Sequence, residues 1–299
     1  MQNRENALLL FAKLPVSGQV KTRLSVLKDG VFSPEDASEL FEAMLLDVID
    51  ICLASFDILK DKEPRSAVVK DDYKLYISTA PASNLEAMRA LVEKAGIPTS
   101  SIRFISDSGA SFDEHYNDAF NQVWEDGADC ILSMGADMPA LSVWDIVRGF
   151  EALHSIDDGG FQESNGSKSS ECKNEMQRTG IVISPDQAMG VSIIGWTSNT
   201  DFDHTGIYYN ETGLTVLPAY IYKAREAQIP VIALPPVPDV DTIADLAHSI
   251  TLLEFAEYAS RFDGSHPASR TIAKLKDLGC FEVRVPPNEL RDSRDIIDG

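Results

Sequence analysis

The sequence predicts an α/β fold in which helices flank a mixed, mostly parallel sheet, with a helical extension at the C-terminus. Two observations support this prediction. Continuous apolar runs such as 7–12 and 130–134 have the length and composition of strands that are buried on both faces. Between such runs lie stretches whose apolar residues recur at helical spacing, so strands and helices alternate along the chain.

The first strand is predicted at 7–12, and a long amphipathic helix is predicted over 34–56. Ser33 is a suitable N-cap for that helix, and Pro34 occupies the first helical position, where its missing N–H is not needed. Apolar side chains at helical spacing follow, so one face of the helix can cover the sheet.

The remaining elements repeat the alternation. Further strands are predicted at 75–78, 102–105, 130–134, 181–184, 191–196 and 231–234. Further helices are predicted at 84–96, before Gly127, after a Ser142 cap, and over 220–227, 243–262 and 269–278.

The chain is expected to form one α/β domain over 1–250, with 251–299 as a C-terminal helical extension packed on it. Within the domain, 154–178 contains almost no apolar residues and is predicted to be a polar surface insertion.

The charge of the chain limits its partners. A formal charge of −21 and a pI near 4.5 argue against DNA or RNA, whose backbone requires a basic face. A few lysines and arginines in one pocket, helped by a metal ion, can still bind a nucleotide.

The cysteines and the hydropathy indicate a cytoplasmic protein without a membrane partner. The 4 cysteines lie far apart and form no Cys-x-x-Cys pair, so neither a zinc site nor a disulfide framework is predicted. The apolar run near the N-terminus is too short for a secretion signal, and no run reaches the roughly 18 residues of a membrane span.

The loop after the first strand, KLPVSGQVKTR, is rich in hydrogen-bond donors. Its donors include Lys13 and Thr22, its small residues are Ser17 and Gly18, and its main charges are Lys21 and Arg23. Small residues let backbone N–H groups approach a phosphate, and an arginine can bind it through two nitrogens. The alternative is a solvated basic loop.

Two acidic motifs are candidates for binding Mg²⁺ or Mn²⁺. Gly135-Ala136-Asp137 places a carboxylate just beyond a strand, at the sheet edge where ligands gather. In Asp239-Val240-Asp241, alternate residues point the same way and can converge on one cation. Simple surface charge is the alternative for the second motif, and Thr242 with Asp245 is expected to cap the next helix.

A further candidate lies at the start of the helix that ends before Gly127. Ser111 would sit at the helix N-terminus, where free N–H groups favour an anion or a polar base edge, and His115 one turn later could face the same pocket. The alternative for His115 is a surface or core histidine.

FAKLPVSGQVKTRL, LSMGADMPAL and DVDTIADL, in this order, resemble the radical-SAM/selenodomain-associated transferase family. That family has the GT-A fold of nucleotide-diphosphate-sugar transferases. The resemblance implies that Lys21 and Arg23 hold nucleotide phosphates, that Asp137 binds the metal, and that Asp239 or Asp241 completes the metal site.

GASFDEHYNDA and VISPDQAMGVSII are also similar to segments of the 2-phospho-L-lactate guanylyltransferase family. This similarity places Gly190 in the substrate site. The chain departs from that family's Thr-Asn at Val191 and Ser192, and from the Asp-Gly-Gly-Tyr of the sugar-transferase-like family at Ala188 to Val191.

Together these features predict a metal-dependent nucleotidyltransferase that moves a nucleotidyl group from an NTP to a small phosphorylated acceptor. One alternative is glycosyl transfer from a nucleotide-sugar, and another is a non-catalytic nucleotide-binding regulator. The expected partners are the nucleotide and a small-molecule acceptor, and a homodimer is compatible with the sequence.

Overall fold

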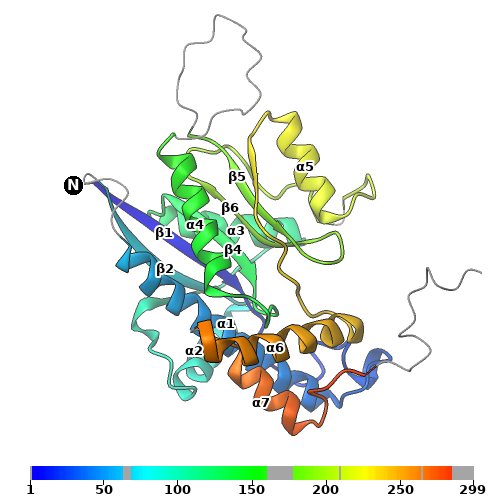
Figure 1. The fold of residues 1–299 in the computed structure, drawn as a ribbon. Coiled ribbons are helices and arrows are strands. Elements are labelled where there is room, and N and C mark those ends of the chain that lie inside the picture. The colour runs from blue at the N-terminus through cyan, green and yellow to red at the C-terminus, as the bar shows by residue number, and fades with distance from the viewer. Residues whose placement is uncertain (1, 63–68, 160–177, 209, 264, 285–299) are drawn as a thin grey trace, which may run out of the picture.

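A computed structural model of the chain contains a mixed sheet with strand order β3-β2-β1-β4-β6-β5-β7 (Figure 1). It describes residues 2–62, 69–159, 178–208, 210–263 and 265–284. β6 pairs antiparallel with β4 and β5, whereas the other strand pairs are parallel, which confirms the predicted fold class. The strands are β1 (Gln2–Phe11), β2 (Val69–Ser78), β3 (Ile102–Ile105), β4 (Cys130–Gly135), β5 (Ile181–Pro185), β6 (Val191–Thr197) and β7 (Val231–Ala233).

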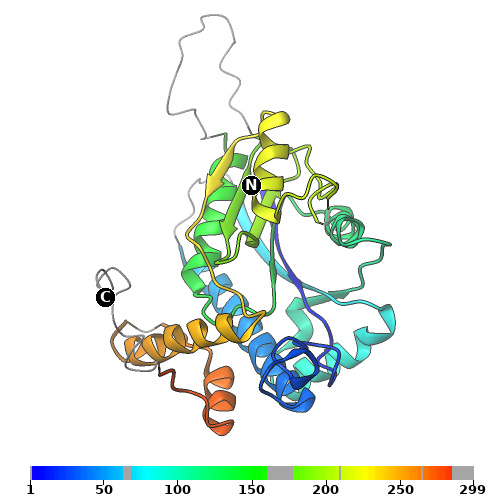
Figure 2. The same ribbon diagram turned by 90° about the vertical axis from the view of Figure 1, so that its right-hand side faces the viewer.

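Helices cover both faces of the sheet (Figures 1 and 2). α1, α2 and α4 share a hydrophobic cluster with one face, and α3 and α5 share a second cluster with the other face. The helices are α1 (Pro34–Asp61), α2 (Leu85–Lys94), α3 (Phe112–Glu125), α4 (Val143–Asp157), α5 (Val216–Glu226), α6 (Ile243–Asp263) and α7 (Ser269–Asp277).

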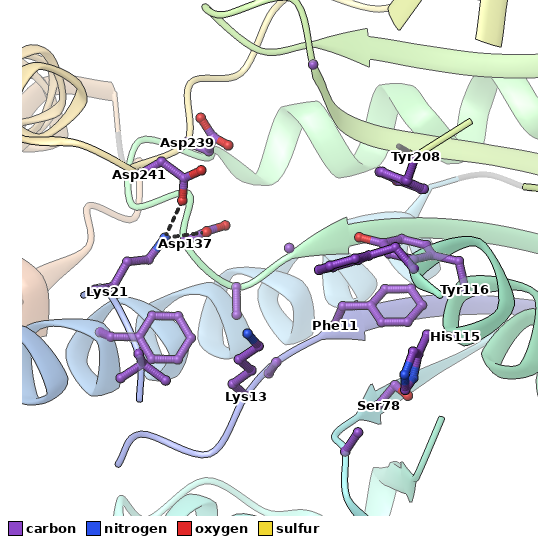
Figure 3. Close-up of a pocket in the computed structure, with 18 of the residues that line it drawn as sticks. Phe11, Lys13, Lys21, Ser78, His115, Tyr116, Asp137, Tyr208, Asp239 and Asp241 are labelled. Atoms are coloured by element: carbon purple, nitrogen blue, oxygen red, sulfur yellow. Dashed lines mark hydrogen bonds and ion pairs between the residues drawn. The ribbon is translucent and has the colours of Figure 1, made fainter. Parts of the chain in front are cut away.

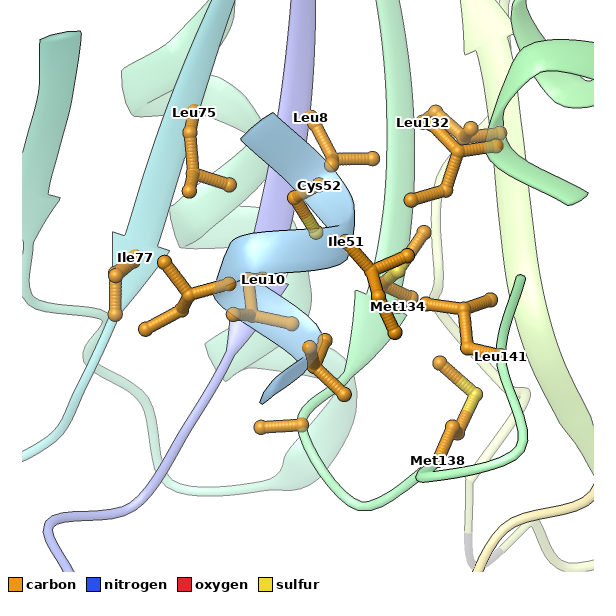
Figure 4. Close-up of a cluster of buried hydrophobic side chains, with 14 of the residues drawn as sticks. Leu8, Leu10, Ile51, Cys52, Leu75, Ile77, Leu132, Met134, Met138 and Leu141 are labelled. Carbon is orange, nitrogen blue, oxygen red and sulfur yellow. The ribbon is translucent and has the colours of Figure 1, made fainter. Parts of the chain in front are cut away.

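The central strand β1 is buried on both faces, as its continuous apolar run predicted. Leu8 and Leu10 point into the cluster beneath α1, while Leu9 points into the opposite cluster. Figure 4 shows Cys52 of α1 lying over Leu8 and Leu10. Each fully buried leucine contributes roughly 1.5–3 kcal/mol of transfer free energy, so this strand is a stable base for the loop that follows it.

The C-terminal helices pack on the N-terminal half of α1. α6 and α7 contribute Leu253 and Ile272 to a third cluster, in which they meet Leu40 of α1. The expected domain boundary at residue 250 falls inside α6, whose buried side chains continue across it. No helix in the described ranges has both the length and the apolar character needed to cross a bilayer.

The predicted insertion at 154–178 begins too early. α4 continues to Asp157, and His154 is buried, with Nε2 2.9 Å from Oδ1 of Asn6. The helix ends where Gly159 adopts a positive φ of 72°. Residues 160–177 of the predicted insertion, and 285–299 of the predicted extension, lie outside the described residues.

The strand order places a crevice beside β1. The chain runs from β1 to β2 and β3 on one side and then crosses to β4 on the other, so the order reverses between β1 and β4. Phe11 at the end of β1 pairs with Gly135 at the end of β4. Ligands of open α/β sheets bind at this kind of switch point, beyond the carboxyl ends of the strands.

Candidate functional site

A cavity of about 900 Å³ lies at this switch point. Its floor comes from the ends of β1 and β4, and its walls come from the first loop, the start of α3, the β5–β6 turn and the segment before α6. Figure 3 shows Lys21, Asp137, Asp239 and Asp241 at one end of the cavity, and Phe11, Tyr116 and Tyr208 at the other.

The first loop folds back on itself after β1. Gly18 and Lys21 have positive φ angles of 74° and 45°, and the Leu24 N–H donates to the Lys21 carbonyl at 2.9 Å. A positive φ is unusual for a lysine and marks a tight turn. Leu24 is fully buried in the cluster formed with α6 and α7, so the turn is anchored from its C-terminal end.

Lys21 connects the loop to both acidic motifs. Its Nζ lies 2.6 Å from Oδ2 of Asp137 and 3.1 Å from Oδ1 of Asp241, and Arg23 Nη1 lies 3.3 Å from the other oxygen of Asp241 (Figure 3). Burial alone would lower the pKa of Lys21, but the attraction of Asp137 and Asp241 outweighs burial and raises it. Lys21 therefore remains charged.

Gly135 leaves room for the Asp137 carboxylate. A Cβ at residue 135 would lie 2.8 Å from Oδ1 of Asp137, closer than side-chain contacts normally allow. The backbone of the second acidic motif is fixed to the same turn, because the Val240 N–H donates to the Asp137 carbonyl at 3.0 Å. The carboxylates predicted to bind a metal therefore do meet at one end of the cavity.

Asp239 carries the most unfavourable charge of this group. Burial, followed by repulsion from Asp137, Asp241 and Asp186, raises its pKa to about 7. Its Oδ1 accepts a hydrogen bond from Nε2 of Gln187 at 3.0 Å, which offsets only part of this effect. The carboxylates thus hold more negative charge than Lys21 neutralises.

Oxygen ligands of this kind suit Mg²⁺ or Mn²⁺, and the raised pKa of Asp239 shows that the group would gain from another cation. In the parts of the chain that the structure describes, however, no three or more Asp, Glu, His or Cys side chains are arranged to share one ion. The Lys21 ammonium instead lies between Asp137 and Asp241. The donor chemistry fits a hard divalent cation, and the present arrangement holds an ammonium there.

The β5–β6 turn contributes Gly190. Oδ1 of Asp186 accepts hydrogen bonds from the N–H groups of Ala188 at 2.5 Å and Gly190 at 2.8 Å. A Cβ on Gly190 would lie 2.0 Å from Oδ2 of Asp186. Gly190 is therefore required for the shape of this turn, which forms one wall of the cavity.

His115 of α3, Asp107 of the loop before it and Ser78 at the end of β2 form a hydrogen-bonded trio. Asp107 accepts from Nδ1 of His115 at 2.7 Å and from Oγ of Ser78 at 2.6 Å, which leaves Nε2 as the second polar atom of the histidine. Ser111 lines the cavity, but its hydroxyl caps the helix by accepting from the Glu114 N–H at 3.3 Å.

The opposite end of the cavity is aromatic. The rings of Phe11 and Tyr116 stack with centroids 4.1 Å apart, and those of Tyr116 and Tyr208 stack at 4.9 Å (Figure 3). These three side chains come from the end of β1, from α3 and from the loop before α5. They form a wall that the sequence did not predict, hereafter the aromatic wall.

No protein-family model and no curated protein matches the sequence. Among solved structures, the chain is similar to a protein of Desulfovibrio desulfuricans named "putative nucleotide-diphospho-sugar transferase", with 21% identity and a TM-score of 0.64 over 92% of this chain and 96% of that one. A cytidylyltransferase of Leptospira borgpetersenii is 12% identical, with a TM-score of 0.44 over 95% of this chain and 100% of that one. The first likeness establishes the nucleotide-diphospho-sugar transferase fold.

Most of the residues predicted from the sequence line this one cavity. They are Lys13, Lys21, Thr22, Arg23, Ser111, His115, Gly135, Asp137, Gly190, Asp239 and Asp241. Ser17 and Gly18 do not: the Ser17 hydroxyl donates to Glu35 at 3.0 Å, and Gly18 supplies the positive φ that the loop needs. Their predicted contact with phosphate gains no support from this placement.

The sequence missed Ser78, Asp107 and the aromatic wall. Ser78 and Phe11 are the last residues of their strands, so the strand-end rule that selected Asp137 could have selected them too. Asp107 begins the 107–120 segment in which only Ser111 and His115 were predicted to act, and Tyr208 lies in a segment without a recognisable motif. The positions of both depend on the packing of elements that are distant in sequence.

Proposed function

We propose that the protein is a nucleotide-dependent transferase that moves a nucleotidyl group from an NTP to a small acceptor. One observation carries this proposal: a basic loop after β1 faces the carboxylates of Asp137, Asp239 and Asp241 across the switch point of the sheet. Side chains that can bind phosphate thus lie next to oxygen ligands that can bind a metal ion, as a bound nucleoside triphosphate requires.

Lys21 and Arg23 would bind the donor phosphates. Both already face carboxylates, so phosphate oxygens would compete with Asp137 and Asp241 for these side chains. Asp137, Asp239 and Asp241 would hold Mg²⁺ or Mn²⁺, which supplies charge neutralisation of the phosphates when bound. Lys13, which is exposed at the cavity, adds a further cation.

The chain's own contribution to catalysis would be positioning and charge stabilisation. The loop orients the α-phosphate for in-line attack, and its ammonium and guanidinium groups stabilise the negative charge of the transition state. A side-chain nucleophile is not needed, and the Ser78 hydroxyl in the cavity donates its hydrogen to Asp107.

The second candidate is glycosyl transfer from a nucleotide-sugar. The likeness to the D. desulfuricans protein named for that chemistry favours it, and so does the aromatic wall, since sugar rings pack well on aromatic faces. The released product separates the two candidates, because nucleotidyl transfer liberates pyrophosphate and glycosyl transfer liberates a nucleoside diphosphate.

The test measures binding of the four NTPs and of nucleotide-sugars, with and without Mg²⁺, by calorimetry on the wild type and on Lys21→Met and Asp137→Asn. Each charge-assisted contact is worth about 1.5–3 kcal/mol, so Lys21→Met should weaken binding by roughly 10- to 150-fold. Asp137→Asn should abolish the effect of Mg²⁺ on affinity. Lys94→Met, on the exposed surface of α2, is the matched control. Unchanged nucleotide affinity in both site variants would refute the proposal.

A further inference from the structure

The cations of the cavity all come from one short stretch. The lysines and arginines among its described lining residues are Lys13, Lys21, Arg23 and Lys28, which belong to the first loop and the turn that follows. The wall from β2 to α3 and the wall from β6 to α5 contribute neither residue type. Among the residues that the structure describes, this stretch is therefore the one place in the cavity with fixed positive charge for a phosphate.

Two of the four cations in this place are already paired with carboxylates. The Lys21 side chain is only 8% exposed and is shared between two carboxylates, and Arg23 is paired with one of them. Among the described residues, Lys13 and Lys28 alone in this set form no ion pair. We expect a bound triphosphate to take up Lys13 and Lys28, which would leave no unpaired cation in this stretch for a second phosphate.

Both other walls are unfavourable for an anion. At the start of α3, the Ala110 N–H already donates to Glu114 and the Glu114 N–H to Ser111, and Asp113 and Glu114 make the first turn negative. Asp107 and Asp186 add negative charge, one on each wall. His115 lies on the wall from β2 to α3, and its Nδ1 already donates to Asp107. A phosphate placed against either wall would face a carboxylate without a compensating lysine or arginine, and like charges repel.

The wall from β6 to α5 suits a neutral ring instead. Val191 and Val216 line it next to Tyr208, and Tyr208 stacks on Tyr116. The Tyr208 hydroxyl is 3.3 Å from the hydroxyl of Tyr220, so its ring is held in place by a polar contact behind it. A rigid aromatic face of this kind packs against the C–H face of a sugar ring.

We infer that the acceptor is an uncharged, hydroxyl-bearing ring, a sugar or cyclic polyol, that lies against the aromatic wall and reacts through a hydroxyl rather than through a phosphate. This inference rests on the proposed nucleotidyl transfer and replaces the phosphorylated acceptor expected from the sequence. The acceptor oxygen attacks the α-phosphorus and forms a P–O bond, the bond to the bridging oxygen breaks, and pyrophosphate leaves with that electron pair. The hydroxyl proton passes to water.

The test separates this inference from the proposed function by using two ligands in turn. The protein is first saturated with Mg²⁺ and the tightest-binding α,β-methylene analogue of ATP, GTP, CTP or UTP. Inorganic phosphate is then titrated into the free and the loaded protein by calorimetry. The expected result is phosphate binding to the free protein, at the first loop, and none to the loaded protein. Val216→Arg, which adds a cation to the β6–α5 wall, should restore phosphate binding to the loaded protein.

Phosphate binding to the loaded wild type, as tight as to the free protein, would overturn the inference and leave the proposed function intact. If no analogue binds, the proposed function and the inference both fall. A second measurement compares free hexoses with their phosphates as acceptors under Mg²⁺ and NTP, with products identified by mass spectrometry. Faster transfer to the phosphates would also overturn the inference.

The aromatic wall has its own readout. Tyr208→Ala should raise KM for the free-sugar acceptor about tenfold, which corresponds to about 1.4 kcal/mol, and leave the Kd of the NTP analogue unchanged. Tyr222→Ala is the matched control, because Tyr222 is 54% exposed on α5 and does not line the cavity. An equal loss of NTP affinity in Tyr208→Ala would place the nucleotide, not the acceptor, on this wall.

Discussion

His204 should make the fold sensitive to acid, and the size of the effect follows from its burial. The side chain is fully buried, and its Nδ1 lies 2.7 Å from the Tyr220 hydroxyl. The centroid of its ring lies 4.8 Å from that of Phe120 and 5.0 Å from that of Tyr116. Its Nε2 has no hydrogen-bond partner among the described residues. Burial lowers the pKa of His204 from 6.5 to about 3, because a charged imidazole would lose its water there.

This shift sets the pH range of the effect. The unfolded chain takes up the proton near pH 6.5, whereas the folded protein resists protonation until about pH 3. The stabilising contribution of the neutral histidine is therefore complete above pH 6.5 and is lost as the pH falls toward 3. Between pH 7 and pH 5 the free energy of unfolding should fall by about 2 kcal/mol from this group alone.

Urea unfolding of the wild type and of His204→Phe, at pH 7 and pH 5, measures this contribution. The variant loses the hydrogen bond to Tyr220 and should be less stable by about 1 kcal/mol at pH 7. At pH 5 it should be the more stable protein by a similar amount, roughly 1 kcal/mol, because it has no imidazole to protonate. His248→Phe, at an exposed position of α6, controls for general effects. A stability difference between wild type and His204→Phe that is the same at both pH values would refute the reasoning.

Three further predictions concern the site and its support. Asp239→Asn should raise the free energy of unfolding at pH 8 by on the order of 1–3 kcal/mol, because the carboxylate, whose pKa is raised to about 7, is destabilising once ionised. The same variant should bind Mg²⁺ more weakly. A lower stability of the variant in urea at pH 8 would contradict this reasoning. Gly190→Ala should lower stability and turnover, because the Cβ of the alanine would meet Asp186. Adding Asp186→Gly to the same chain should recover part of the loss, and additive effects of the two substitutions would exclude this steric clash as the cause. Asp47→Ala should lower the free energy of unfolding in urea by about 2–4 kcal/mol, because the buried carboxylate accepts hydrogen bonds from two N–H groups at the start of α7. Asp57→Ala, at an exposed position, should leave the stability unchanged, and equal losses in the two variants would argue against this reasoning.

The interior of the fold could be predicted because burial leaves a pattern in the sequence. The apolar run at 7–12 identified the central strand, and the predicted capping by Ser33, Ser142 and Thr242 is present in the structure. The N-terminal ends of the strands could not be predicted in this way. β1 begins at Gln2 and β2 at Val69, since ladder hydrogen bonds continue after the apolar residues end.

A polar network, which hydrophobic periodicity does not reveal, lies at those strand ends. Arg4 of β1 is buried against Asp71 of β2 and against Asp157 and Asp158 at the end of α4. Charged residues usually indicate solvent exposure, so the strands predicted at 7–12 and 75–78 leave out Arg4 and Asp71, and the predicted insertion includes Asp157 and Asp158. The members of this network come from three separate parts of the chain, and only the folded sheet brings them together.

A site residue could be predicted where it follows a strand, but not where only packing brings it to the cavity. Asp137 and Lys21 follow β4 and β1, and both line the cavity. Tyr208 is brought to the cavity by its stacking on Tyr116 and by its contact with Tyr220. No local pattern in the sequence describes contacts of this kind.

The two charged sides of the cavity share one mechanical support. Leu24, next to Arg23 of the first loop, and Val240, between the aspartates, are fully buried in the same cluster as Leu253 and Ile272 of the C-terminal helices. Lys21 can reach both Asp137 and Asp241 only while these anchors keep their separation. α6 and α7 therefore fix the distance between the basic loop and the carboxylates. A chain cut at residue 250, inside α6, should lose the proposed nucleotide binding.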